Sequence, residues 1–288
     1  MPELPEVETV RRGLSELIVG KKVASVAHDT PKSFPNAVTD VRQFLIGASI
    51  KEVRRRAKVL IIDLNNNYSL MIHLKMTGQL VFVGDVRFGA GHPNDSLVNA
   101  LPDKSTRVTL VFEDGSQLYF NDQRKFGWVR LMPTVELANV DFMMKVGPEP
   151  LEDSFTAEQF AARFARRSRT NIKAAILDQS VIAGVGNIYA DESLWGAKIH
   201  PQRLVSSLTK KEFEKLYSEL RQVMNLAIEK GGSSNHTYVN AEGKKGSYMD
   251  FARVFRREGL PCPRCGTTIE KLRVAGRGTH ICPYCQKL

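Results

Sequence analysis

Four cysteines close to the C-terminus give the clearest chemical signal in the sequence. They form two Cys-x2-Cys pairs, Cys262 with Cys265 and Cys282 with Cys285, and sixteen residues separate the pairs. Four thiolates at this spacing are typical of a structural zinc site in which each pair occupies a tight turn. Two disulfides are the alternative, but the charged first twenty residues do not resemble a secretory signal, and the cytosol keeps thiols reduced. We therefore expect one structural zinc ion, whose closed coordination shell gives it no catalytic role.

The N-terminal residues 1–6 (MPELPE) contain a second chemical feature. Methionine before proline is usually removed, and its removal would leave Pro2 with a free secondary amine. Because an α-amino group titrates at about pH 8, a useful fraction of this amine is neutral and nucleophilic at pH 7. Such an amine can attack an aldehyde-level carbon to form a cationic iminium, while Glu3 moves protons. The alternative is an ordinary processed N-terminus that leads into a helix.

A third feature is the glycine turn at residues 183–190 (AGVGNIYA), which lies between two predicted helices. It is not a dinucleotide-binding fingerprint, because the third glycine is absent and no strand precedes it. Two glycines beside Asn187 can expose backbone N–H groups at the start of a helix, where phosphate binds readily. An ordinary helix–helix turn is the other interpretation, and the turn alone does not decide between the two.

The balance of charge favours a polyanionic partner. The 288 residues carry a formal net charge of +10, and basic residues outnumber acidic ones by eight to two from Arg253 onwards. A basic protein of this kind commonly binds nucleic acid, although a generally basic surface is the alternative. The sequence contains no run of eighteen apolar residues, so we expect a cytoplasmic protein without a membrane span.

Apolar periodicity predicts the elements that must position these groups. A helix is expected at 3–19 and a second, shorter one at 38–46. Short β-branched runs predict strands at 22–27, 59–64, 70–74, 79–83, 107–112, 117–120 and 128–132. The glycine-rich, polar segment 84–105 is expected to form a long loop. Many short strands joined by turns favour a sandwich or a barrel.

A change of character near 133–150, where proline and glycine accumulate, predicts a linker. The helices expected after it span 156–166, 171–178, 188–195 and 209–230. Residues 231–234 (GGSS) end the last helix and open a polar stretch that extends to about 250. The cysteine segment closes the chain, and we expect a β-hairpin between its two pairs with Arg277 held at the turn.

Together these features resemble the formamidopyrimidine-DNA glycosylase family along nearly the whole chain. Besides the glycine turn and the cysteines, the resemblance depends on 2–9 (PELPEVET), 55–58 (RRAK), 73–78 (HLKMTG) and 122–127 (DQRKFG). It implies an α+β multidomain protein with an N-terminal β-sandwich and leading helix, a helix-two-turn-helix domain and a C-terminal zinc finger. The corresponding ranges are 2–132, 151–250 and 251–288, with 133–150 as the linker. The resemblance also implies that DNA binds in the cleft between the domains.

The resemblance further implies a bifunctional DNA glycosylase and AP lyase of base-excision repair. Its substrates would be oxidised purines, 8-oxoguanine and formamidopyrimidines, and it would need no organic cofactor. By motif, Pro2 attacks the sugar carbon that bears the damaged base, and Glu3 protonates and opens the sugar, with Glu6 helping to align the site. The iminium acidifies sugar protons, so that β- and δ-elimination cut the strand. Lys58 matches the position assigned to acid–base work in β-elimination, and Arg277 the arginine linked to phosphate binding and δ-elimination.

Base flipping follows from the same resemblance. A base inside a duplex is out of reach and must be flipped out. Met76, Arg124 and Phe126 match the side chains that fill the resulting gap: apolar wedges, and an arginine that can hydrogen-bond the orphaned base. Residues 231–250 match the mobile loop that closes on the extruded base.

Phosphate contacts are implied at three further positions. Lys173 and Asn187 match phosphate-gripping residues, and Tyr248 matches a phosphate-contacting tyrosine. Two departures from the family pattern concern the grip on DNA. Ser105 stands where the family often has a DNA-contacting histidine, and Ser168 stands where a basic residue is common.

Two other functions compete with this expectation. The first is endonuclease VIII-like excision of oxidised pyrimidines, but that branch usually has glycine where this chain has Leu4. The second is a non-catalytic protein that binds damaged DNA, although the intact set Pro2, Glu3, Lys58 and Arg277 argues for an enzyme. In each case we expect the partner to be double-stranded DNA and the protein to be a monomer.

Overall fold

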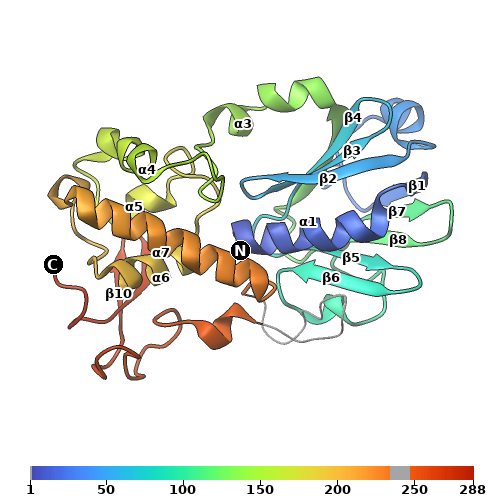
Figure 1. Cartoon of the computed structure of the whole chain (residues 1–288). Coiled ribbons are helices and arrows are strands. Elements are labelled where there is room, and N and C mark those ends of the chain that lie inside the picture. The colour runs from blue at the N-terminus through green and yellow to red at the C-terminus, as the bar shows by residue number, and fades with distance from the viewer. Residues whose placement is uncertain (1, 234–246) are drawn as a thin grey trace. The chain divides into compact units, whose positions relative to one another are not determined.

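The computed structural model describes residues 2–233 and 247–288. The described chain divides into two compact units (Figure 1). The first comprises Met1–Met144 with Lys230–Ser247, and the second comprises Lys145–Glu229 with Tyr248–Leu288. None of the described helices combines the length and the apolar character that a bilayer span requires.

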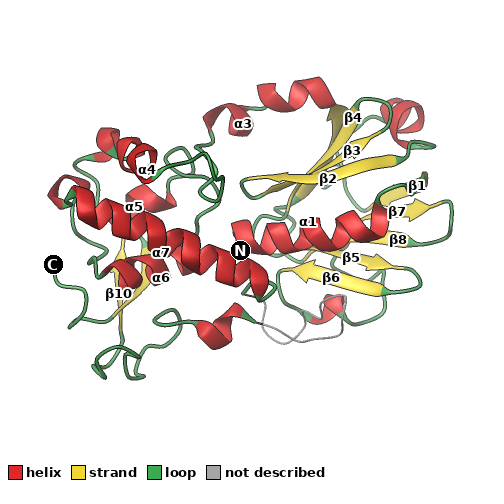
Figure 2. Ribbon diagram, in the orientation of Figure 1, coloured by secondary structure: helices red, strands yellow, loops and turns green. Residues whose placement is uncertain are grey.

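The first unit is built on two antiparallel sheets (Figure 2). One sheet has the strand order β1 (Val23–His28), β7 (Thr106–Phe112), β8 (Gln117–Asp122), β5 (Gly78–Val83), β6 (Arg87–Gly91). The other has the order β2 (Ile50–Arg56), β3 (Val59–Leu64), β4 (Tyr68–His73), β9 (Trp128–Pro133). The short helices of this unit are α2 (Val38–Asp40), which continues as one π turn (Val41–Leu45), and α3 (Asp141–Lys145).

Helix α1 (Leu4–Ile18) and both sheets share one apolar core. Val7, Val10 and Leu14 of α1 are fully buried in it because they recur at three- and four-residue steps on one helix face. Side chains of both sheets enter the same core, for example Leu60 of β3 and Phe120 of β8. Two sheets that bury their facing sides together form a sandwich, which confirms the expected architecture.

Two strands correct the expectations drawn from the sequence. The segment 84–105, expected to be a long loop, contains β6, whose glycines hid it: a Cβ on Gly91 would lie 2.6 Å from the Gly78 carbonyl oxygen. Strand β2 was not expected because it is a charged edge strand, in which only Ile50 and Val53 are buried. Local sequence patterns detect such strands poorly, since β6 has glycine at two of its five positions and β2 has most of its side chains at the surface.

The second unit is helical and ends in a hairpin. Its helices are α4 (Ala157–Arg163), α5 (Ile172–Leu177), α6 (Asn187–Ala197) and α7 (Lys210–Glu229). The hairpin pairs β10 (Glu270–Val274) with β11 (Arg277–Ile281). All four helices were predicted from the sequence, and the hairpin has the predicted turn. Helix α6 is buried over nearly its whole length and packs against α5, α7 and β11, so it is the centre of this unit.

Candidate functional site

The start of α1 holds Pro2 and Glu3 in a buried position. Glu3 is only 3% exposed, and Pro2 is buried beside it. The backbone N–H of Glu3 donates to Glu6 Oε2 at 2.7 Å, which closes the first turn as a capping interaction. The positive end of the helix dipole favours carboxylates at this place. Pro5 suits the first turn because that turn needs no donor from it. The nucleophile expected from the sequence is therefore presented by a rigid helix end.

Glu6 also connects this helix end to the segment that follows α7. Its Oε1 accepts a hydrogen bond of 2.8 Å from the backbone N–H of Ser233. Gly232 approaches closely, with φ of +86°, and a Cβ there would lie 3.1 Å from Glu6 Cγ. The expected mobile loop 231–250 begins here, but its residues 234–246 lie outside the described part of the chain.

Lys58 lies at the turn between β2 and β3. A second set of contacts holds this turn to α1. Arg55 Nε is 3.2 Å from Glu8 Oε2, and Arg55 Nη1 donates to the carbonyl oxygen of Ala57 at 2.9 Å. Burial alone would raise the pKa of Glu8, but hydrogen bonds and charges of Arg11, Arg12 and Arg55 lower it overall. Lys58 itself is 5% exposed. An ionised Glu8 thus fixes the Lys58 turn against the helix that carries Pro2.

A neutral imidazole lies in the electrostatic neighbourhood of Lys58. Burial of His73, followed by the positive charges of Lys75 and Lys58, lowers its pKa to about 3. Its Nδ1 accepts the backbone N–H of Lys75 at 3.0 Å, so the tautomer carries its proton on Nε2. From the sequence, His73 was only one residue of the 73–78 motif, and no role was predicted for it. The burial that lowers its pKa depends on the fold and cannot be seen in the sequence.

Arg124 and Phe126 project from the turn between β8 and β9. Phe126 is 46% exposed, which is unusual for an aromatic residue, and the Arg124 guanidinium lies 4.9 Å from its ring centre. Buried Asp122 shapes the turn by accepting the backbone N–H groups of Phe126 at 2.8 Å and Gly127 at 2.7 Å. An exposed apolar side chain on a rigid turn is suited to enter a base stack.

Met76 is tied to the same turn through Thr77. The Thr77 hydroxyl donates to Asp122 and accepts the backbone N–H of Arg124 at 3.0 Å. Met76 is half-exposed beside it. The three side chains expected to fill the gap in the duplex therefore come from two turns that Asp122 and Thr77 join. Neither of these connecting residues was assigned a role from the sequence, although both belong to the quoted motifs.

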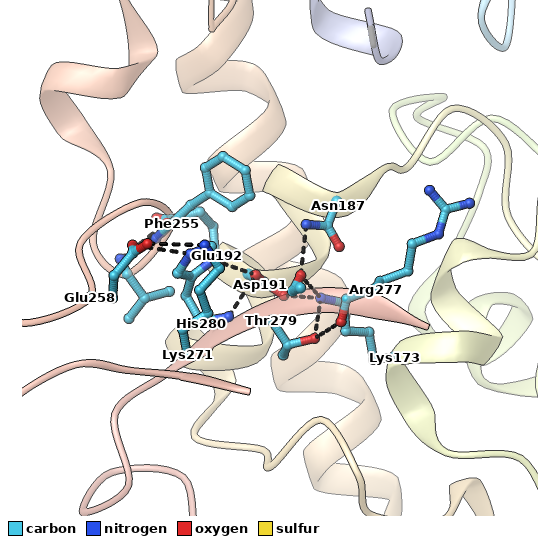
Figure 3. A network of polar contacts seen from close by, with 12 residues as sticks. Lys173, Asn187, Asp191, Glu192, Phe255, Glu258, Lys271, Arg277, Thr279 and His280 are labelled. Atoms are coloured by element: carbon cyan, nitrogen blue, oxygen red, sulfur yellow. Dashed lines mark hydrogen bonds and ion pairs between the residues drawn. The ribbon is translucent and has the colours of Figure 1, made fainter. Parts of the chain in front are cut away.

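Lys173 lies in the second unit, at the centre of a buried polar network (Figure 3). Its ammonium donates to Asp191 Oδ1 at 2.6 Å, to Thr279 Oγ1 at 2.7 Å and to the Gly278 carbonyl at 3.1 Å. The side chains of Lys173 and Asp191 are both 0% exposed. The sequence analysis expected Lys173 to contact phosphate, whereas the structure surrounds its ammonium with protein oxygens.

Asn187 and Arg277 belong to the same network (Figure 3). Asn187 begins α6, and its Nδ2 donates to the Gly278 carbonyl at 2.9 Å. Arg277 lies at the exposed turn of the hairpin, and its side chain extends away from the network. These two residues, unlike Lys173, are not fully enclosed.

Tyr248, Ser105 and Ser168 have different surroundings. Tyr248 is 1% exposed, and its hydroxyl lies 3.1 Å from the buried carboxylate of Glu192, so its side chain is directed into the protein. Ser105 is 3% exposed, and its hydroxyl donates to Asp103 at 2.7 Å. Of these three only Ser168 is exposed. The geometry therefore offers no open hydroxyl at Tyr248 or Ser105 for a DNA contact.

Glu192 is a structural residue that the sequence analysis did not single out. Burial raises its pKa, against the lowering effect of hydrogen bonds from the backbone and from Tyr248. Its carboxyl group accepts the backbone N–H groups of Arg253, Val254 and Phe255 at 2.8 to 3.1 Å. Glu192 thereby attaches the segment that precedes the cysteines to α6.

The four cysteines form a cluster that fits zinc. Their Sγ atoms all lie within 4.8 Å of one another, and Cys265 Sγ is 3.5 Å from those of both Cys282 and Cys285. A disulfide would need about 2 Å, whereas sulfurs about 2.3 Å from a tetrahedral zinc lie roughly 3.8 Å apart. Four thiolates without an open position hold a fold and perform no chemistry. The predicted structural zinc site is thus confirmed.

Three family models match consecutive parts of the chain. A model described as the formamidopyrimidine-DNA glycosylase N-terminal domain matches residues 1–129, and one described as the H2TH domain of the same glycosylase matches 146–239. A third, described as a zinc finger found in FPG and IleRS, matches 259–288.

Relatives and solved structures agree with these matches. Proteins named formamidopyrimidine-DNA glycosylase from Streptococcus mutans and Pediococcus pentosaceus are 41% and 43% identical over the full length of both chains. A Lactococcus lactis Fpg in complex with DNA that contains an abasic site superposes with a TM-score of 0.86 at 36% identity, covering 99% of this chain and 100% of the other. The same protein was also solved with DNA that contains an oxidised pyrimidine, at 35% identity, full coverage of both chains and a TM-score of 0.85.

Proposed function

The chain belongs to the formamidopyrimidine-DNA glycosylase family, and from this premise we propose which of its residues carry each step of base excision. The protein is a DNA glycosylase and AP lyase of base-excision repair, and we propose that its substrates are damaged purines in DNA. Its charge of +10 suits a polyanionic substrate. We propose further that it acts as a monomer, in the cytoplasm beside the chromosomal DNA.

Pro2 is the proposed nucleophile. After removal of Met1, its nitrogen forms a bond to the sugar carbon that bears the damaged base and loses its proton. The bond from that carbon to the base breaks, and the base leaves with the electron pair and takes up a proton. Glu3 supplies a proton to the sugar oxygen, so that the ring opens and the nitrogen is left as an iminium. The supporting observation is the buried, capped start of α1, which keeps both groups in a fixed position.

Lys58 and Arg277 are proposed for strand cleavage. The iminium withdraws electrons, so a neighbouring sugar C–H loses its proton and the phosphate on one side departs in β-elimination. Lys58 is proposed to move this proton and to contact phosphate. Arg277 is proposed to bind phosphate and to promote δ-elimination, which releases the phosphate on the other side. A cation lowers the energy of the departing phosphate in both steps.

Base flipping is assigned to the two joined turns of the first unit. Met76 and Phe126 are proposed to occupy the gap that the flipped nucleotide leaves. Arg124 is proposed to hydrogen-bond the orphaned base. The support comes from the exposure of Phe126 and from the Asp122 contacts that hold the turn.

Glu3→Gln tests the proposed division of labour. The variant keeps the size of the side chain but has no proton to give, so excision of 8-oxoguanine should fall by at least about 100-fold. Cutting of a preformed abasic site should retain a large part of its rate, since that substrate has already lost its base. Nicking gels with the two duplexes measure both rates.

The control is Glu16→Gln on the exposed face of α1, which should leave both rates unchanged. Equal losses on the two substrates would contradict the assignment of Glu3 to base release. A parallel duplex with an oxidised pyrimidine measures the competing specificity, because a relative of this chain has been crystallised with such DNA.

A further inference from the structure

Lys173 is placed where a DNA-binding lysine would not be expected. It is 0% exposed, and its three acceptors lie on α6 and on the hairpin. To reach a phosphate, the ammonium would have to leave all three and abandon the buried carboxylate of Asp191. Removing one partner from a buried ion pair leaves an uncompensated charge, which strongly opposes such a movement.

The network of Lys173 leads directly to Arg277 (Figure 3). Thr279 Oγ1 accepts from Lys173 and donates to the carbonyl oxygen of Arg277 at 3.1 Å. Gly278, which follows Arg277 in the chain, accepts a hydrogen bond from the Lys173 ammonium through its carbonyl oxygen. The chain of contacts therefore runs from the Asp191 carboxylate through the ammonium and the Thr279 hydroxyl to the backbone of the finger arginine.

Asp191 also binds the backbone of β11 directly. Its Oδ2 accepts the backbone N–H of His280 at 2.9 Å, while its Oδ1 binds Lys173. Three consecutive residues after Arg277 are thus fastened to α5 and α6. The turn itself consists of Ala275 and Gly276, which are exposed and adopt positive φ angles of +48° and +76°, and the strand before it is anchored by the buried side chain of Val274.

We propose that Lys173 and Asp191 form a positioning pair that fixes the direction in which Arg277 leaves the hairpin. The pair acts through Thr279 and does not itself bind DNA. A two-stranded hairpin has little stability of its own, whereas a functional arginine must be held within a fraction of an ångström by its supporting residues. The inference rests on the proposed role of Arg277 in phosphate binding and δ-elimination.

Thr279 offers the sharpest test, because the hydroxyl can be removed without breaking the ion pair. Thr279→Val removes the link to Arg277 and keeps the shape, whereas Thr279→Ser keeps the hydroxyl. Thr279→Val should weaken binding to a duplex with a tetrahydrofuran abasic analogue by about 3- to 10-fold. It should also lower the ratio of δ- to β-elimination products on abasic DNA. Thr279→Ser should restore both values most of the way towards wild type.

A double-mutant cycle with Arg277→Ala tests whether Thr279 acts through the arginine. If it does, Thr279→Val should add no further loss of affinity once Arg277 has been replaced. Leu220→Ala in the core of α7 serves as the control, since it destabilises this unit without touching the network. It should lower the melting temperature but leave the product ratio unchanged. Zinc content should equal one per chain in every variant that is compared.

The results separate the inference from the proposed function. Wild-type protein that fails to cut abasic DNA would overturn the proposed function. If the wild type cuts abasic DNA and the Thr279→Val variant has the same affinity and product ratio as the wild type, the positioning pair is refuted. The pair is also refuted if the effect of Thr279→Val adds fully to the effect of Arg277→Ala. It is also refuted if Lys173→Met in the Arg277→Ala background still reduces the slope of log Kd against log salt by about 0.9, since Lys173 would then hold a phosphate itself.

Discussion

His73 shows how one buried residue makes stability depend on pH. Burial, followed by the charges of Lys75 and Lys58, lowers its pKa in the folded protein from the ordinary 6.5 to about 3. The shift is downward, so the folded state is fully stable with respect to this group above pH 6.5 and loses stability as the pH falls towards 3. The wild type should therefore lose free energy of unfolding between pH 7 and pH 4.5. In the His73→Asn variant this loss should be smaller by on the order of 2–3 kcal/mol.

Urea denaturation at the two pH values measures this difference. His28→Asn is the matched control, because His28 lies exposed at the end of β1. It should reproduce the pH dependence of the wild type. The account of His73 fails if the His73→Asn variant loses as much stability between pH 7 and pH 4.5 as the wild type does.

Single residues also mark the boundary of what the sequence could predict. Residue type and motif nominated Lys173 as a candidate, but its partners Asp191 and Thr279 are 18 and 106 residues away in the chain. Only the folded structure can show that these oxygens take up the ammonium. Tyr248 illustrates the same point, since its hydroxyl is enclosed beside Glu192, 56 residues away in the chain.

At the level of elements, prediction succeeded where periodicity is strong. Helices α1 and α7 have one apolar face each and were expected almost residue for residue. Strand β6 escaped because Gly89 and Gly91 are needed for close approach to Leu97 and Gly78, and glycine carries no pattern. The zinc cluster was predictable because its signal is local: each Cys-x2-Cys pair forms one turn.

The finger depends on its metal because its apolar core is very small. Among the described residues, the apolar cluster around Cys262 and Cys282 contains three further buried side chains, those of Val254, Ile269 and Trp195, and the hairpin adds Val274 and Ile281. Such a small core does not hold a fold without additional bonds, and zinc supplies them. Elemental analysis should find one zinc per chain, and Cys265→Ser should lose zinc together with at least about 10-fold in affinity for tetrahydrofuran duplex.

The matched variant for this experiment is Lys287→Ala, which changes an exposed residue close to the cluster. It should retain zinc and lose little affinity. Metal-free wild-type protein that binds the duplex with unchanged affinity would contradict a structural role for the metal.

The molecule as a whole divides its proposed functions between the two units. Pro2, Glu3 and Lys58 belong to the first unit, as do Met76, Arg124 and Phe126. Asn187, Arg277 and the positioning pair belong to the second. Each unit buries its own apolar side chains, for example Leu60 in the first and Leu220 in the second, so each group of side chains is fixed by separate packing. Base release, β-elimination and base flipping are thus proposed for the first unit, and δ-elimination for Arg277 of the second unit.

Reduction with borohydride tests the central claim, covalent catalysis by Pro2, most directly. An iminium between Pro2 and the sugar is reduced to a stable amine, so processed wild-type protein should become irreversibly attached to abasic or 8-oxoguanine DNA. Peptide mapping should place the link on Pro2. A form that retains Met1 should give no product, since the proline nitrogen is then a planar amide without an available lone pair. A link that maps to Lys58, or one that forms while Met1 is retained, would contradict the account.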